Sequence, residues 1–152
     1  MMKKIAFLIG VLALGALALA ASGEQVYAQC AGCHQANGQG VPGAFPPLAK
    51  ELPLIVAKGD AGRQFLIQVV LFGVQGPIVA QGKTYNSAMP PYGHLSDADV
   101  AAVLNYALTA WGNDQLLPKG FKPLTAEEVK ALRATKLSPQ QVFENWKKLG
   151  LK

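Results

Sequence analysis

The chain has 152 residues, a length that predicts one domain once any leader has been removed. It has only two cysteines, which excludes a zinc site built from four of them. Residues 116–152 hold eight Lys or Arg against three Glu, whereas residues 22–115 hold four against six acids. The high pI therefore gives no support for nucleic-acid binding, and we interpret the C-terminal lysines as the solvated faces of two amphipathic helices.

The first 21 residues have the composition of a secretory signal peptide. Lys3 and Lys4 precede an apolar run over residues 5–21, and Ala18-Leu19-Ala20 is a small-residue cleavage sequence. We expect cleavage after Ala20 or Ala21 and export to the periplasm or the outer face of a bacterial cytoplasmic membrane. An uncleaved anchor is the alternative, since the run is at the lower edge of what spans a bilayer.

The stretch Cys30-Ala31-Gly32-Cys33-His34 follows near the start of the mature chain. It is Cys-x-x-Cys-His, the sequence to which c-type haem is attached. In a helix its two thiols and its imidazole face the same way, because they stand at i, i+3 and i+4. The thiols would add to the two vinyl groups of the porphyrin, and His34 would ligate the iron.

Two other interpretations of the pair of cysteines stay open at this point. Cys30 and Cys33 could form a structural disulfide or a thioredoxin-like redox pair. The redox motif requires a preceding strand and a βαβ context, whereas the residues before Cys30 have a helical pattern. Covalent attachment of one haem c is therefore the favoured interpretation.

Capping residues and apolar periodicity predict five further helices. The expected N-caps are Ser22, Asp60, Ser96, Thr125 and Ser138. The helix from Asp60 should run for about a dozen residues and end at Gly73. The helix after Ser96 should carry one apolar stripe from Val100 to Trp111 and end at Gly112, followed by a linker over residues 113–123. Between them, residues 78–80 and 83–85 predict a short hairpin.

An iron held by one histidine has a sixth position to fill. Without the leader, Met89 is the only methionine and His94 the only second histidine. Met89 stands in a proline-rich loop before a strong helix, where the backbone can be held against the haem. Its soft thioether favours Fe(II), and His/Met ligation raises the reduction potential. We expect Met89 to be the ligand, with His94 or an open position as the alternatives.

The proximal histidine also needs a partner for its second ring nitrogen, and the carbonyl of Pro46 is the candidate. The sequence offers candidates for the pocket wall as well, although each is equally well explained as ordinary core. These are Phe45, Leu48, Leu66, Val70 and Tyr85. In so small a chain the haem itself would form a large part of the core.

These residues together resemble the class I cytochromes c. The family pattern is present as Cys30-x-x-Cys33-His34, then Pro46-x-Leu48, then Met89-Pro90 before a closing helix. Other stretches point to the soluble Thermus type, which passes electrons from the respiratory chain to a terminal oxidase. These are residues 27–35, 38–40, 43–49, 83–86, 121–123, 125–130 and 147–152. One departure concerns Tyr27, which stands three residues before the first cysteine where the wider class has its aromatic residue four before.

The resemblance implies an all-α class I fold around one covalent haem, with a short β-hairpin and crossing first and last core helices. It assigns Pro46 as the partner of the proximal histidine and Leu48 as a packing residue on the haem. We expect a signal peptide over 1–21, a haem domain over 22–115 and a helical C-terminal extension over 116–152 that packs on it.

The expected function is one-electron transfer by a monomeric carrier without catalytic residues. The expected acceptor is a terminal cytochrome c oxidase, and the donor a quinol-oxidising complex or another dehydrogenase. Since the basic residues lie in the extension, docking at the haem edge should not depend on a ring of lysines. The alternatives are a fixed haem subunit of a larger enzyme, or an enzyme or ligand sensor whose sixth iron position is open.

Overall fold

The computed structural model describes residues 21–152. The predicted signal peptide lies outside the described residues except for its last position. In chain order the elements are α1 (Gly23–Tyr27), α2 (Ala31–His34), α3 (Leu52–Val56), α4 (Asp60–Phe72), β1 (Ile78–Ala80), β2 (Lys83–Tyr85), α5 (Asp97–Thr109), the 3-10 helix η1 (Ala110–Leu116), α6 (Ala126–Arg133) and α7 (Pro139–Lys148). Across residues 21–152, no helix is both long and apolar enough to span a membrane.

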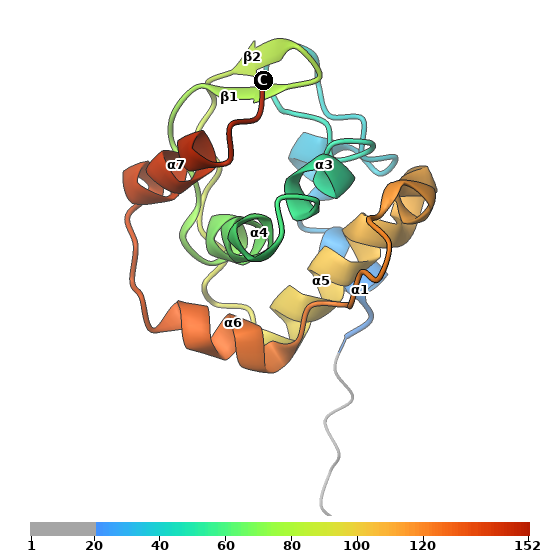
Figure 1. The fold of residues 1–152 in the computed structure, drawn as a ribbon, viewed down its shortest axis with the longest axis vertical. Helices are drawn as coiled ribbons and strands as arrows, with labels where there is room; N and C mark the ends of the chain where they lie inside the picture. The colour runs from blue at the N-terminus through green and yellow to red at the C-terminus, as the bar shows by residue number, and fades with distance from the viewer. Residues whose placement is uncertain (1–20) are drawn as a thin grey trace, which may run out of the picture.

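Helices α1 and α5 pack against each other at one side of the molecule (Figure 1). Ser22 caps α1 in a full capping box with Gln25, so the predicted start is confirmed. The two backbones approach so closely at Gly23 that an added Cβ would collide with the carbonyl of Ala102. The expected crossing of the first and last core helices is therefore present, and the Tyr27 ring lies 5.5 Å from that of Tyr106 within it.

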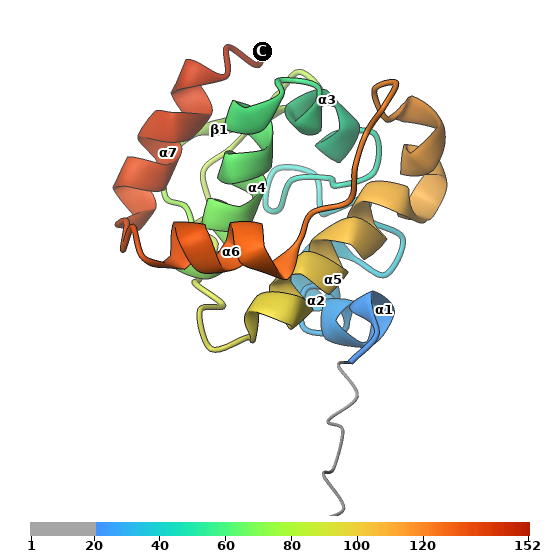
Figure 2. The same cartoon turned by 60° about the horizontal axis from the view of Figure 1, so that its bottom comes forward.

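Helix α4 crosses the centre of the molecule and is buried along most of its length (Figures 1 and 2). The prediction of Asp60 as its N-cap was wrong by one residue. Gly59, with φ +68°, holds the non-helical cap position, and Asp60 is the first helical residue. Its carboxylate still stands in the first turn, where the helix dipole favours negative charge. The end at Gly73 is confirmed.

The end of α5 differs from the prediction. Ser96 caps its start as expected, but the helix stops at Thr109, because Ala110 is extended and Trp111 adopts φ +56°. The Trp111 ring folds back toward the haem motif, where its Nε1–H donates to the Ala36 carbonyl at 3.0 Å. The residues expected to begin the linker instead continue as η1, and Asn113 within it is fully buried.

The hairpin is present with the predicted bounds, and Val79 pairs with Thr84 at its centre. The last two helices, α6 and α7, lie on the outside of the molecule and pack on α4 and α5 (Figures 1 and 2). Their predicted capping boxes, from Thr125 and Ser138, are both confirmed. The chain thus has a mainly α class I architecture with one short hairpin.

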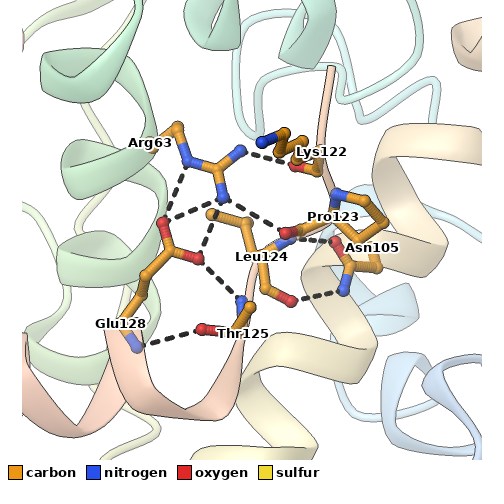
Figure 3. Close-up of polar contacts among 7 residues, drawn as sticks. All are labelled: Arg63, Asn105, Lys122, Pro123, Leu124, Thr125 and Glu128. Atoms are coloured by element: carbon orange, nitrogen blue, oxygen red, sulfur yellow. Dashed lines mark hydrogen bonds and ion pairs between the residues drawn. The ribbon is translucent and has the colours of Figure 1, made fainter. Parts of the chain in front are cut away.

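Two arginines connect this C-terminal part to the rest. Figure 3 shows Arg63 of α4 donating to the Glu128 carboxylate at 2.9 and 3.0 Å and to the carbonyls of Lys122 and Pro123. Arg133 of α6 bonds the Asp97 carboxylate at 2.7 Å. Both ends of α6 are therefore fixed by a charged side chain.

Candidate haem-binding site

The Cys-x-x-Cys-His sequence forms a single turn of helix. Cys30 is the N-cap of α2, and its carbonyl accepts from the N–H groups of Cys33 at 3.2 Å and His34 at 2.9 Å. All three side chains line the same cavity, as the spacing predicts. Neither cysteine forms a disulfide in the described part of the chain. One short turn therefore presents two thiols and an imidazole to one space.

His34 is oriented by the residue that the sequence analysis selected. Its Nδ1 lies 2.9 Å from the carbonyl oxygen of Pro46. A carbonyl only accepts, so Nδ1 carries the proton and Nε2 keeps its lone pair. The side chain is 7% exposed, and burial lowers its pKa, while the bond to Pro46 raises it. Both the tautomer and the neutral charge suit an iron ligand.

The loop after the motif is folded tightly, which explains the position of Pro46. Val41 and Phe45 form an antiparallel bridge, so the chain turns back on itself. The Gly38 carbonyl then accepts from the N–H groups of Leu48 at 2.8 Å and Ala49 at 2.9 Å. Backbone hydrogen bonds therefore return the proline segment to the histidine.

The cavity contains about 1230 Å³ of empty space, with the solvent at its mouth included, and its wall is mostly apolar. Residues from every helix and strand from α1 to α5 line it, together with Trp146 of α7. All predicted wall candidates are among them: Phe45, Leu48, Leu66, Val70 and Tyr85. A large apolar slot beside two thiols and one neutral imidazole fits a covalently attached porphyrin. Within residues 21–152, no cluster of three or more His, Cys, Asp or Glu could hold a metal ion by itself.

Met89 lines the same cavity and is held by its backbone. Its N–H donates to the Val74 carbonyl at 3.0 Å, and the Val74 N–H donates back at 3.1 Å. This pairing brings the Met89 carbonyl against Gly73, where φ is +73° and a Cβ would collide with that oxygen. The end of α4 thus fixes the methionine loop, and Gly73 is the residue that permits the contact.

His94 is placed differently. It is exposed and is not among the residues that line the cavity. Its Nε2 lies 3.4 Å from the Gln29 side chain, and its ring lies 5.9 Å from that of Tyr92. Of the two candidates for the sixth position, the structure brings Met89 to the site and leaves His94 outside it.

Other ionisable groups near the motif have pKa values moved by burial. Burial raises the pKa of the Cys30 thiol, and the neighbouring Cys33 adds to this. The pKa of Tyr27 is raised by burial and then by Cys30 and Tyr106, and its hydroxyl donates to the Gln35 carbonyl at 2.8 Å. Burial, followed by the two cysteines, also raises the pKa of Tyr92. These groups stay neutral at ordinary pH, as an apolar cavity requires.

Sequence reasoning missed three residues of the site. Glu51 follows a lysine in an unremarkable stretch, yet it is buried in the cavity wall. Asn113 was placed in a linker, but its amide donates to the Leu48 and Ala107 carbonyls and accepts from Lys50 N–H, so it fixes the pocket loop. Trp146 was assigned to the extension alone, although it also reaches the cavity. The one sequence signal for the burial of Trp146 was its place on the apolar face of the last predicted helix.

Comparison with known proteins agrees with this geometry. Residues 20–111 match the family model for cytochrome c. The chain is 58% identical over 146 residues to a cytochrome c-552 of Thermus thermophilus, an alignment that covers 95% of this chain and 97% of that protein. It is also 34% identical over 116 residues to the cytochrome c subunit of the quinone alcohol dehydrogenase of Gluconobacter oxydans, covering 75% of this chain and 22% of that protein.

The motif, the cavity and the relatives lead to one conclusion. A cytochrome c domain implies covalently bound haem c, and Cys30 and Cys33 fit its attachment motif. The close similarity extends over nearly the whole described chain, including the C-terminal helices. The chain belongs to the cytochrome c family, as a class I c-type cytochrome close to the Thermus type.

Proposed function

We propose that this haem c electron carrier holds its iron between His34 and Met89 and delivers electrons to a terminal cytochrome c oxidase. The observation that carries the proposal is the convergence of four side chains on one apolar cavity. Cys30, Cys33 and His34 come from one turn of helix and Met89 from a loop much later in the chain, and all four line it. The bound haem supplies an iron that changes between Fe(III) and Fe(II).

The roles of the two axial residues follow from their surroundings. The hydrogen bond to Pro46 orients the His34 ring and leaves Nε2 available. Backbone pairing with Val74 holds Met89 in the cavity wall, so its thioether needs little reorganisation to remain a ligand. A soft donor stabilises Fe(II), and the apolar wall excludes water from the iron. Together they support rapid one-electron exchange at a raised potential.

This arrangement also supports a carrier without catalytic activity of its own. With Met89 on the iron, no coordination position is left for a substrate. The cytochrome c subunits named among the relatives belong to dehydrogenases, which leaves a fixed-subunit role as the second candidate. An open sixth position, as in an enzyme or a gas sensor, would require Met89 to be displaced.

The mouth of the cavity supports docking without charge pairing. The exposed residues that line it are Ser87, Ala88 and Pro90, which are all uncharged. Residues 29–49 and 84–96, which supply the haem motif and the methionine loop, contain no Asp, Glu, Lys or Arg. A small uncharged contact suits a transient carrier, because charge pairs mainly change association rate and salt dependence. We therefore expect electron transfer to the oxidase to depend weakly on ionic strength.

Export completes the proposal. Covalent attachment of haem to thiols takes place outside the bacterial cytoplasm, and the first 21 residues have signal-peptide composition. The electron donor would then be a quinol-oxidising complex or another dehydrogenase facing the same compartment. Fractionation of the native host, with mass spectrometry of the mature N-terminus, tests both cleavage and compartment.

The decisive experiment replaces the sixth ligand. Met89→Ala should open the iron to added ligands and lower the reduction potential, because the soft donor is lost. His94→Ala is the matched control and should leave the ferric absorption spectrum and the potential unchanged. An unchanged Met89→Ala protein, with the effect appearing in His94→Ala, would overturn His/Met ligation. A wild-type reduced protein that binds carbon monoxide readily would favour the enzyme or sensor class.

A further inference from the structure

Glu51 is a buried acid in an otherwise apolar wall. Its side chain lines the haem cavity and is 7% exposed. Its Oε2 is the one buried side-chain nitrogen or oxygen within residues 21–152 that has no hydrogen-bond partner. Leaving such an atom unsatisfied costs free energy, so its persistence in a folded site calls for a function.

Two segments meet beside Glu51. It is the N-cap residue of α3, and the turn of the hairpin is bonded to the chain two residues before it. In that turn Gln81, with φ +49°, donates from its side chain to the Ala49 carbonyl at 2.8 Å. The backbone N–H of Gln81 faces the Glu51 carboxyl group and lowers its pKa. Oε2 remains without a hydrogen-bond partner.

Charged neighbours do not neutralise Glu51. Among the described residues, the ion pairs are Arg63–Glu128, Arg133–Asp97 and Lys147–Glu144. Within residues 21–152, no lysine or arginine lines the cavity. The ionisable groups on the elements packed around α3 and its cap are Asp60 and Arg63 of α4, Asp97, Asp99 and Tyr106 of α5, Asp114 of η1, Lys50 beside it, and Lys83 and Tyr85 of the hairpin.

Of these groups, only Tyr85 shares the cavity wall with Glu51, and the lysines and Asp114 are exposed. The other ionisable groups of the wall are Tyr27, Cys30, Cys33, His34 and Tyr92. Burial raises the pKa of Glu51, while the Gln81 N–H lowers it by less. The charge on the haem is therefore the main variable charge that a carboxylate in this wall would experience.

We propose that Glu51 is a redox-linked proton site of this cytochrome. When the iron accepts an electron from its donor, the cavity loses one positive charge, and the Glu51 carboxylate takes up one proton from solvent to form an O–H bond. On oxidation the electron leaves for the acceptor, and the same O–H bond breaks, which returns the proton to solvent. Charge compensation in a low-dielectric cavity is the physical reason for the coupling.

The test measures the reduction potential of the holoprotein against pH. In the wild type the potential should fall as pH rises, by as much as a tenfold change in the redox equilibrium per pH unit, or about 59 mV. Glu51→Gln keeps the shape of the side chain and removes the titrating proton. The fall of the potential between the pKa values of Glu51 in the oxidised and the reduced protein should therefore disappear. Glu24→Gln, an exposed acid of α1, is the matched control and should keep the wild-type slope.

Redox-difference infrared spectroscopy gives a second measurement. Reduction should produce the carbonyl band of a protonated carboxyl group in the wild type, and this band should be absent in Glu51→Gln. If that variant fails to fold with haem, Glu51→Asp serves instead and should shift both the band and the pH window. A slope and a band unchanged by both substitutions would assign the proton to the haem propionates and overturn the proposal. The inference rests on bound haem c and not on Met89, so the two proposals fail separately.

Discussion

The haem-binding part, residues 22–115, and the C-terminal extension, residues 116–152, are stabilised by different means. The first surrounds a large apolar cavity, and backbone hydrogen bonds fix the segments that carry its ligands. The second has two complete capping boxes, and each ion pair within residues 21–152 includes at least one of its residues. The haem-binding part thus surrounds the space for its cofactor with its own buried apolar side chains, while the extension is attached to it by charged and apolar side-chain contacts.

The contacts of the extension with the haem-binding part indicate a structural role. The net charge of the extension is +5 against −2 for the haem-binding part, yet its Glu128 bonds α4 and its Arg133 bonds α5. Trp146, on the apolar face of the extension, lines the haem cavity. We propose that the extension is a separate structural unit that braces the haem-binding part from behind. The alternative is that its lysines form the docking site of a redox partner.

Truncation after Leu117 should cause the largest change in stability. The cut keeps Asn113 but removes five buried apolar side chains, each worth about 1.5–3 kcal/mol before ordering costs. We expect the holoprotein to lose several kcal/mol of its free energy of unfolding, with near-normal electron transfer to the oxidase at low temperature. Calorimetry measures the stability, and oxidase kinetics measures the electron transfer. A stable truncated protein that no longer reduces its partner would move docking onto the extension.

Trp146→Ala should give the next largest change. The indole is 6% exposed and stacks on Phe143 with ring centroids 5.7 Å apart. Removing it leaves a hole beside the haem cavity, for which about 3–5 kcal/mol of destabilisation is typical. Chemical denaturation of the holoprotein gives the value. Lys147→Ala on the same helix, which removes an exposed ion pair with Glu144 and a cation–π contact with Phe143, should change stability by about 1 kcal/mol or less. Equal effects would contradict the proposed brace.

Arg63→Ala should have an intermediate effect. The guanidinium group is partly buried and bonds the Glu128 carboxylate and two carbonyls of the extension (Figure 3). We expect a loss of about 1–3 kcal/mol, since hydrogen bonds to charged groups are involved. Lys58→Ala, an exposed residue close in sequence, is the control. Faster proteolysis of the extension in Arg63→Ala, with an unchanged absorption spectrum, would show that the contact holds the extension rather than the haem.

Local signals in the sequence were enough for much of the fold and for the haem motif. Capping residues located the starts of most helices, and the Cys-x-x-Cys-His spacing placed three groups on one side of a helical turn. The hairpin was found with its correct bounds because its strands are separated by Gln81-Gly82. These features depend on neighbours within a few residues, which the sequence displays directly.

What escaped prediction depends on contacts between distant segments. Trp111 continued the apolar stripe of α5, but its backbone turns away so that the indole can bond Ala36, 75 residues earlier. Asn113 bonds Leu48, which stands 65 residues before it. Glu51 is buried in the cavity wall, and Gln81 of the hairpin turn bonds the Ala49 carbonyl beside it, 32 residues earlier. The sequence gives no sign of such pairings. A polar residue that a distant segment buries has the same sequence context as one in an exposed loop.

The smallest expected effect concerns Glu51 and the pH dependence of stability. Burial raises the pKa of this carboxyl group above its ordinary value in the folded protein. Between the unfolded and folded pKa values the folded state binds more protons, so its stability falls as pH rises through that window and stays lower above it. Glu51→Gln should remove this contribution, which makes the variant gain stability relative to the wild type as pH rises above the ordinary pKa of a glutamate carboxyl group.

Denaturant unfolding of the reduced holoprotein at a series of pH values measures that difference. The matched variant Glu24→Gln should follow the wild type, because its carboxylate is exposed and solvent screens it. A gap between Glu51→Gln and wild type that stays constant with pH would mean that Glu51 titrates alike in the folded and the unfolded protein, so that the cavity wall does not raise its pKa. The apolar wall would then tolerate a charge, and the contrast between an apolar cavity and a polar brace would be weaker than the structure indicates.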